Sequence, residues 1–246
     1  MNFIDTIASI PLTTKVFLIC FAFFSLVEII LALFEKNFLR KLIKPLCLMF
    51  LGIAVTIALP SHRFLYFATY LGMAGDILLI SKRKKFLFPL GTFSFMLGHI
   101  FYYVEINTVL LPTLGLSMKW WFHVLYWSLV VAFTFIFFKP IKKAFQLKFF
   151  TGLGCSLYYM VLISSSVMYT IATIATFGAG ITTYMWLAII GIVFFIFSDI
   201  FLGYTTYVKE IKRRDFYIML TYLVAECLIV LAFVLTYYSN PTVFTF

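Results

Sequence analysis

Charged side chains are scarce in this sequence, and acidic ones are the scarcest. Only 11% of its 246 residues are charged, with 9 Asp and Glu against 19 Lys and Arg, whereas 64% are hydrophobic. A soluble domain of this length needs a larger polar surface than so few charged residues provide. The composition therefore excludes an ordinary soluble protein and indicates a chain that lies within a lipid bilayer.

Cysteine is also rare, and its four residues, Cys20, Cys47, Cys155 and Cys227, all fall within apolar stretches. They form no Cys-x-x-Cys motif and no set with histidine, which are the usual patterns of disulfide frameworks and zinc sites. We expect them to pack between helices. The sequence predicts neither a metal site nor a cofactor.

The basic residues that are present fall at regular intervals. Sixteen of the nineteen lie in four clusters, which are Lys36, Arg40, Lys41 and Lys44; Lys82 to Lys85; Lys139, Lys142, Lys143 and Lys148; and Lys209 and Lys212 to Arg214. Two apolar spans separate each cluster from the next. Basic loops of polytopic membrane proteins face the cytoplasm. The net charge of +10 therefore reflects topology, and we expect no nucleic-acid partner.

Spans of about 20 apolar residues are needed to cross a hydrocarbon core about 30 Å thick. The sequence accordingly predicts an all-α membrane protein with eight transmembrane helices, in a single integral membrane domain formed by residues 1–246. The predicted spans are 14–34, 45–60, 64–81, 87–110, 120–138, 149–176, 184–207 and 216–238. With the odd-numbered loops inside, both termini face outside.

Prolines help to place the ends of these spans. Pro45 is expected to open the second span, in the first helical turn, where its missing N–H costs nothing. Pro60 is expected to close that span.

Five carboxylates lie within the predicted spans, although no Lys or Arg lies deep in any of them. These acids are Glu28, Asp76, Glu105, Asp199 and Glu226. An acid in hydrocarbon is costly and points to function by default. Glu105 is expected to reach water near the outer boundary. Glu28 suits a structural partner as well as a site residue.

Asp76 and Asp199 share their surroundings. Each follows a small residue and precedes Ile-x-Leu, on a span that runs from outside to inside. Helix rise places Asp76 about 9 Å and Asp199 about 8 Å from the inner boundary. The two acids are therefore expected to meet in the inner half of the bilayer. Their positions four spans apart suggest two parallel four-helix repeats.

Further polar residues fall near the same depth. His99 lies on the fourth span, Glu226 on the eighth, and Tyr158 and Tyr159 on the sixth. A single buried polar group is usually a satisfied packing element. Several at similar depths favour a polar chamber, because lipid offers them no partner.

Five short motifs resemble those of one family, and they occur in the same order. The motifs are Lys44-Pro45-Leu46, Gly75-Asp76-x-Leu78-Leu79, Phe95-x-x-Gly98-His99-x-x-Tyr102, Ser198-Asp199-x-x-Leu202 and Tyr222-x-x-Ala225. Together with the eight spans, they make the chain similar to the YhhN-like lysoplasmalogenases. The chain departs from the family pattern at Glu226, where glutamine is usual.

The resemblance implies hydrolysis of the vinyl-ether bond of a lysoplasmalogen to a fatty aldehyde and a glycerophospho-base. Such chemistry needs one protonated carboxyl group and one carboxylate, and Asp76 and Asp199 can supply the pair. Which of them is the acid stays open, because such a pair titrates as a unit. His99, Tyr102 and Tyr158 are candidates to orient water or the acids, with Glu226 nearby. Lys44, or a basic residue of the third loop, is a candidate to contact the lipid phosphate.

Two other classes of function stay open at this point. A transporter or proton-coupled carrier also uses acids within the membrane, although its spans are often broken near the midplane by Gly or Pro. A structural or signalling protein would leave the paired aspartates unexplained. We expect a multi-pass protein of the cell (inner) membrane, with the bilayer and a lysophospholipid as partners and with its oligomeric state open.

Overall fold

The computed structural model describes residues 2–80, 87–116, 149–207 and 209–244, with a few single positions between 120 and 131. Every regular element in this part of the chain is helical, which confirms the all-α prediction. The elements are α1 (Phe3–Ser9), α2 (Leu12–Leu33), α3 (Asn37–Ala58), α4 (Arg63–Ile80), α5 (Leu87–Glu105), the π-helix η1 (Ile106–Leu110), α6 (Leu111–Thr113), α8 (Phe149–Gly178), α9 (Trp186–Tyr207) and α10 (Arg214–Ser239).

Six stretches are long and apolar enough to cross a membrane. They are Leu12–Leu33, Phe38–Ala58, Arg63–Ile80, Leu87–Thr113, Val161–Gly178 and Arg214–Ser239. Within α9, the apolar part Trp186–Leu202 is shorter. The predicted fifth span, 120–138, falls almost entirely outside the described residues. The protein therefore has the helices of a multi-pass membrane protein, while the count of eight stays a prediction.

The prediction that Pro45 opens a helix is wrong. Helix α3 begins at Asn37, so Pro45 lies in its interior. Proline has no N–H to donate to the carbonyl of Lys41, one turn earlier. Membrane helices tolerate such a residue because neighbouring helices, hydroxyl side chains, water or a local change of helix type can satisfy the freed carbonyl.

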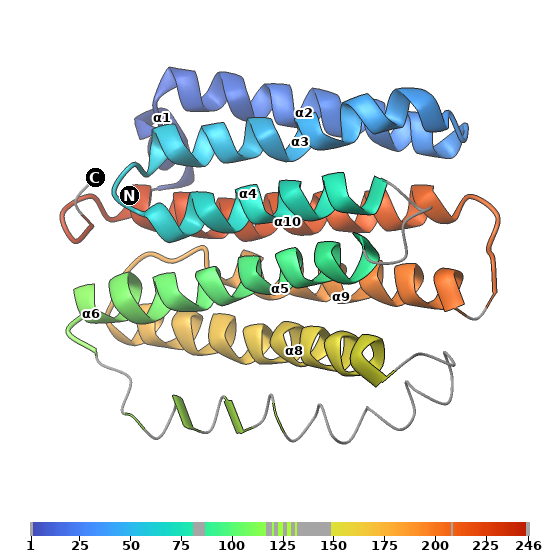
Figure 1. The fold of residues 1–246 in the computed structure, drawn as a ribbon. Coiled ribbons are helices and arrows are strands. Elements are labelled where there is room, and N and C mark those ends of the chain that lie inside the picture. Colours follow the sequence, from blue (N-terminus) through green and yellow to red (C-terminus); the bar gives the residue numbers. More distant parts are fainter. Residues whose placement is uncertain are drawn as a thin grey trace.

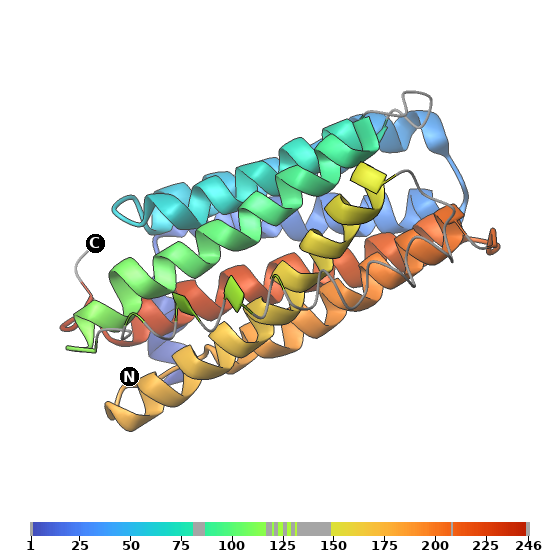
Figure 2. The same cartoon turned by 60° about the horizontal axis from the view of Figure 1, so that its bottom comes forward.

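The long helices pack in a closed order around the bundle. Each of α2, α3, α4, α5, α8, α9 and α10 contacts the next, and α10 also contacts α2. Figures 1 and 2 show these helices lying side by side with similar axes. Helix α10 has the largest buried share among the six candidate spans, at 61%. It therefore acts as the central support of the bundle.

The two ends of the bundle differ in character. The α2–α3 and α9–α10 connections, which carry basic clusters, lie together at the right of Figure 1. We call this the basic end. The described parts of both chain termini lie at the opposite end (Figure 1). Their position at one end agrees with the predicted topology.

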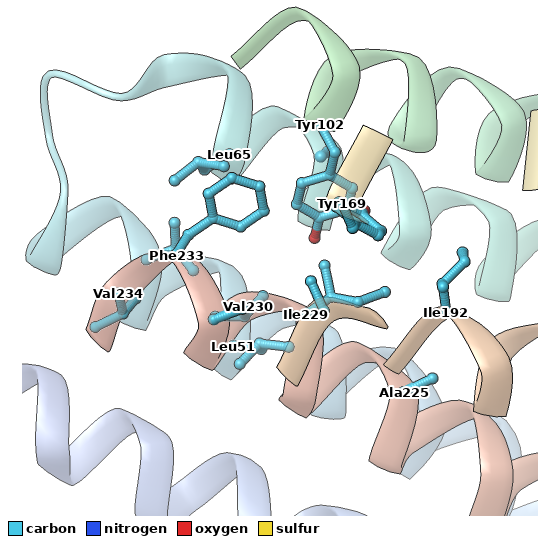
Figure 3. Close-up of a cluster of buried hydrophobic side chains, with 14 of the residues drawn as sticks. Leu51, Leu65, Tyr102, Tyr169, Ile192, Ala225, Ile229, Val230, Phe233 and Val234 are labelled. Carbon is cyan, nitrogen blue, oxygen red and sulfur yellow. The ribbon is translucent and has the colours of Figure 1, made fainter. Parts of the chain in front are cut away.

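Aromatic and aliphatic side chains fill the middle of the bundle. Figure 3 shows Tyr102 of α5 in the same side-chain cluster as Ile229 and Phe233 of α10. The rings of Tyr102 and Phe233 are stacked, with centroids 5.7 Å apart and planes inclined by 11°. Such contacts hold α5 against α10, because close packing replaces the hydrophobic effect as the force between helices in lipid.

Helices α9 and α10 approach closely at Gly191. A Cβ atom at this position would lie 2.8 Å from Cγ1 of Ile229 and 3.0 Å from the carbonyl oxygen of Ala225. The absence of a side chain therefore lets the two backbones meet. Nearby, the hydroxyl of Ser198 donates a hydrogen bond of 3.1 Å to the carbonyl of Ile218. These contacts set the position of α9, which carries Asp199.

Candidate active site

A pocket of about 520 Å³ opens among α3, α4, α5, α9 and α10 near the basic end. Both candidate aspartates line it, Asp76 from α4 and Asp199 from α9. They are 1% and 7% exposed. Two acids far apart in sequence therefore face one cavity, as their matching surroundings predicted.

Asp76 has two polar neighbours in the pocket wall. Nζ of Lys44 lies 3.0 Å from its Oδ1, which forms an ion pair between α3 and α4. The hydroxyl of Tyr222, on α10, also lies near the Asp76 side chain. Lys44 was a candidate for the lipid phosphate, but the structure places its ammonium group on the acid.

Asp199 has a different environment. The hydroxyl of Tyr158, on α8, is a neighbour of its carboxyl group. The two acids therefore have similar sequence contexts but lie beside different side chains, Lys44 for Asp76 and Tyr158 for Asp199.

Aromatic rings form one wall of the pocket. Phe95, Phe195 and Tyr222 meet edge to face, with centroids 5.5 to 6.2 Å apart. Edge-to-face packing aligns the positive edge of one ring with the negative face of the next. This rigid wall keeps the Tyr222 hydroxyl near Asp76 and gives the pocket an apolar side.

The polar side chains of α10 lie beside Gly72 of α4. A Cβ atom there would lie at contact distance from Oε1 of Glu226 and from the Tyr222 hydroxyl, at 3.4 and 3.6 Å, and only 2.9 Å from Cδ1 of Leu48. Tyr222 and Glu226 are four residues apart, so they share one face of α10. This face lies against α4 one turn from Asp76, and the absence of a side chain at Gly72 accommodates Leu48 of α3.

Three predicted supporting residues lie behind the pocket wall. His99, Tyr102 and Glu226 are buried, and none of them is among the residues that line the described pocket. The His99 ring packs edge to face on Phe195, with centroids 4.6 Å apart. The structure therefore gives His99 contact with the wall and not with the cavity.

Charged side chains surround the mouth of the pocket. Arg40 lies 2.9 Å from Glu28 and 2.6 Å from Asp215, and Arg214 lies 3.0 Å from Asp215. This network connects α2, α3 and α10. Glu28 is thus a structural partner, one of the two roles left open for it. Arg40 was overlooked as a site residue because its cluster has a complete explanation in topology.

The expectation that Glu105 reaches water is wrong. Glu105 is fully buried, with its Oε1 atom 2.6 Å from Nδ1 of His62 and 3.1 Å from the hydroxyl of Tyr237. The His62 ring also stacks on that of Tyr237, with centroids 4.4 Å apart. We call these three residues the distal cluster, because they lie at the end of the bundle away from the basic end. His62 and Tyr237 gave no signal in the sequence, since each lies near a span boundary.

Among the described residues, no group of three or more His, Cys, Asp or Glu side chains is arranged to hold a metal ion. The polar groups that line the pocket are the carboxyl groups of Asp76, Asp199 and Asp215, the hydroxyls of Tyr222 and Ser198, the ammonium groups of Lys41 and Lys44, and the guanidinium groups of Arg40 and Arg214. This set can transfer protons, stabilise a cation and bind an anion.

A comparison with protein families matches residues 39–233 to the model described as the YhhN family. The matched region covers most of the chain, so the protein belongs to this family, as the ordered motifs predicted. Neither a comparison with curated proteins nor one with solved structures gives a match.

Proposed function

We propose that this member of the YhhN family is a membrane hydrolase that cleaves the vinyl-ether bond of lysoplasmalogens. The observation that carries the proposal is the pair of buried acids, Asp76 and Asp199, in one pocket with a basic mouth and an aromatic wall. The products are a fatty aldehyde and a glycerophospho-base. Family membership supports this activity in general terms, and the pocket supplies groups suited to the reaction.

The reaction begins with protonation of the β-carbon of the vinyl ether. This step converts the double bond to a single bond and leaves an oxocarbenium ion at the α-carbon and oxygen. Water adds to the α-carbon and loses a proton, which gives a hemiacetal. Collapse of the hemiacetal breaks the bond between the α-carbon and the ether oxygen. The oxygen leaves with a proton as the glycerol hydroxyl, so one water is consumed and the acid is regenerated.

We assign the proton donor to Asp199. An ammonium group beside a carboxyl group favours its charged form. Nζ of Lys44 lies 3.0 Å from Oδ1 of Asp76, so Asp76 is the better carboxylate and Asp199 takes the role of the acid. In this proposal the neighbouring Tyr158 positions Asp199.

Asp76 is then the carboxylate that stabilises the cation and accepts the proton of the attacking water. The negative charge of the Asp76 carboxylate attracts the positive charge that develops on the oxocarbenium ion, which stabilises the transition state. The Tyr222 hydroxyl next to Asp76 can hold the water molecule in line. In this scheme Lys44 pairs with the Asp76 carboxylate and does not bind the lipid phosphate.

His99, Tyr102 and Glu226 keep a supporting role in this proposal. They lie behind Phe195, Tyr222 and Gly72, so they act through the shape of the wall. The basic end is placed at the cytoplasmic face, with the pocket mouth at the inner leaflet of the cell membrane.

The deciding experiment incubates the purified protein with lysolipids that differ only at the first chain linkage. An alkenyl lysolipid should release fatty aldehyde, whereas alkyl and acyl analogues of the same chain length should not. The alkyl analogue lacks the double bond to protonate and should bind without cleavage. Absence of aldehyde from the alkenyl substrate under conditions where the protein is folded would reject the proposed activity.

A further inference from the structure

The mouth of the pocket contains four cations whose partners differ. Arg40, Lys41, Lys44 and Arg214 all line it. Lys44 is paired with Asp76, and Arg40 with both Glu28 and Asp215. The charges of Lys44 and Arg40 are therefore already paired with acids of the protein.

Lys41 and Arg214 have N–H donors that the described ion pairs do not use. Within the part of the chain that the structure describes, Lys41 is exposed and forms no ion pair, although it lines the pocket. Arg214 uses its Nε atom for Asp215 at 3.0 Å. A guanidinium group has five N–H donors, so the Nη groups of Arg214 remain for another acceptor. The mouth thus carries positive charge that the described ion pairs do not neutralise.

We propose that Lys41, together with the Nη groups of Arg214, binds the phosphate group of a single-chain phospholipid. This inference rests on the proposed function and identifies the head-group subsite of the same pocket. Lysine and arginine are the usual ligands of phosphate, since both donate charge-assisted hydrogen bonds to its oxygens.

The spacing along α3 fits such a substrate. Lys41 precedes Lys44 by three residues, or about 4.5 Å of helix rise. Lys44 contacts Asp76, so the phosphate ligand lies about one turn nearer the basic end than the acid. An extended glycerol unit spans about 5 Å between its two terminal oxygens, from bond lengths near 1.5 Å. A phosphate at Lys41 therefore places the ether oxygen of the same glycerol near Asp76.

The test measures binding of an uncleavable alkyl-ether lysophospholipid to the full chain in nanodiscs. An alkylglycerol with the same chain and no phosphate is the matched ligand. Lys41→Gln should weaken binding of the lysophospholipid about tenfold, because the loss of one hydrogen bond to a charged group lowers an affinity by about this factor. Binding of the alkylglycerol, which has no phosphate, should stay unchanged. Arg214→Gln should act in the same direction.

Lys36→Gln is the control variant. It removes the same charge from the same basic cluster at an exposed residue outside the pocket lining, and it should change neither affinity. A similar loss of lysophospholipid affinity in the Lys36 and Lys41 variants would mean that general surface charge causes the effect, and it would overturn the subsite. Equal affinity of the wild-type protein for the two ligands would also overturn it.

Glycerol 3-phosphate alone distinguishes a lipid head group from a free phosphate ester. It should not compete at concentrations where the lysophospholipid saturates the pocket. Competition at equal concentration would mean that the hydrocarbon chain of the lipid contributes nothing to affinity, and it would reject a lipid ligand.

Kinetics separates this inference from the proposed activity. If the wild-type protein cleaves alkenyl lysophospholipid, Lys41→Gln should raise KM about tenfold, and the increase should be absent with a phosphate-free alkenylglycerol. Unchanged KM in an active protein contradicts the subsite alone. Absence of any cleavage contradicts the proposed activity, while the binding experiment still decides the subsite.

Discussion

At the scale of single residues, the two pocket acids differ more than their sequence contexts do. The Lys44 ammonium group lies against Asp76, and the Tyr158 hydroxyl is a neighbour of Asp199. In the proposed reaction, Lys44 keeps Asp76 as the carboxylate. Removal of the Lys44 charge would leave this buried carboxylate without its cation.

Asp76→Asn and Asp199→Asn should each abolish aldehyde release from an alkenyl lysolipid. Asparagine keeps the size and polarity of aspartate but cannot exchange the proton. The expected loss is about a hundred to ten thousand fold for each variant, and the double variant should be little worse, because the pair acts as a unit. Initial rates of aldehyde formation measure the effect.

Asp5→Asn provides the control for this pair, since Asp5 is an exposed acid in α1 far from the pocket lining. It should retain wild-type rates. Vinyl-ether cleavage that survives in both pocket variants would remove the aspartates from the mechanism. The carrier hypothesis would then become the leading one.

The distal cluster carries a prediction about stability. Glu105→Ala should lower the free energy of unfolding by about 3 kcal/mol, because it leaves His62 buried without its partner. Turnover per folded molecule should hardly change, since the cluster lies at the end of the bundle away from the pocket. Thermal unfolding in detergent, followed in parallel with aldehyde release, measures both quantities. A variant with normal stability and no turnover would assign Glu105 to the reaction instead.

At the scale of helices, one close approach positions the site. Helices α9 and α10 meet at Gly191, and they carry Asp199 and Tyr222 respectively. Because the Ala225 backbone lies against Gly191, rotation of a flexible side chain cannot make room for a larger residue at this position. The separation of the two pocket walls therefore depends on a residue that has no chemistry of its own.

Gly191→Ala should destabilise the protein by about 1 to 3 kcal/mol and lower turnover, because the new methyl group would overlap Ile229. Gly178→Ala is the matched control. A Cβ atom at Gly178 meets nothing within 4 Å, so this variant should unfold at the wild-type temperature. Equal melting temperatures for the two variants would contradict the close-packing argument.

At the scale of the whole molecule, charge distinguishes the two ends. The basic end carries the Arg40 network and the mouth of the pocket, and the opposite end carries the distal cluster and both described termini (Figure 1). A lipid that enters from one leaflet meets cations before it meets the acids. This order suits a substrate whose phosphate stays at the interface while its ether bond lies deeper.

Reporter fusions test the orientation of the bundle. A reporter after Phe246 should read outside the cytoplasm, and one inserted at Lys212 should read inside, because basic loops stay in the cytoplasm. A cytoplasmic reading at Phe246 would reverse the orientation and place the pocket mouth at the other leaflet.

Much of this arrangement follows from the sequence by itself. Apolar spans and basic loops are local properties, so they predicted the helices and the shared end of the α2–α3 and α9–α10 connections. The repeated context of Asp76 and Asp199 predicted that both lie at one depth, since helix rise converts sequence distance into depth. Both acids line one pocket, as that reasoning required. The family also followed from short ordered motifs.

Only the tertiary structure decided which buried charges have partners. Arg40 meets Asp215 across 175 positions of sequence, and Tyr237 meets Glu105 across 132. Helical periodicity places a residue at a depth and on a face, but it does not say which other helix stands opposite. For that reason Glu105 was expected in water, Lys44 was a candidate for the phosphate, and His99 was expected beside the cavity. Packing between helices placed the first in a hydrogen bond with His62, the second on Asp76 and the third behind an aromatic wall.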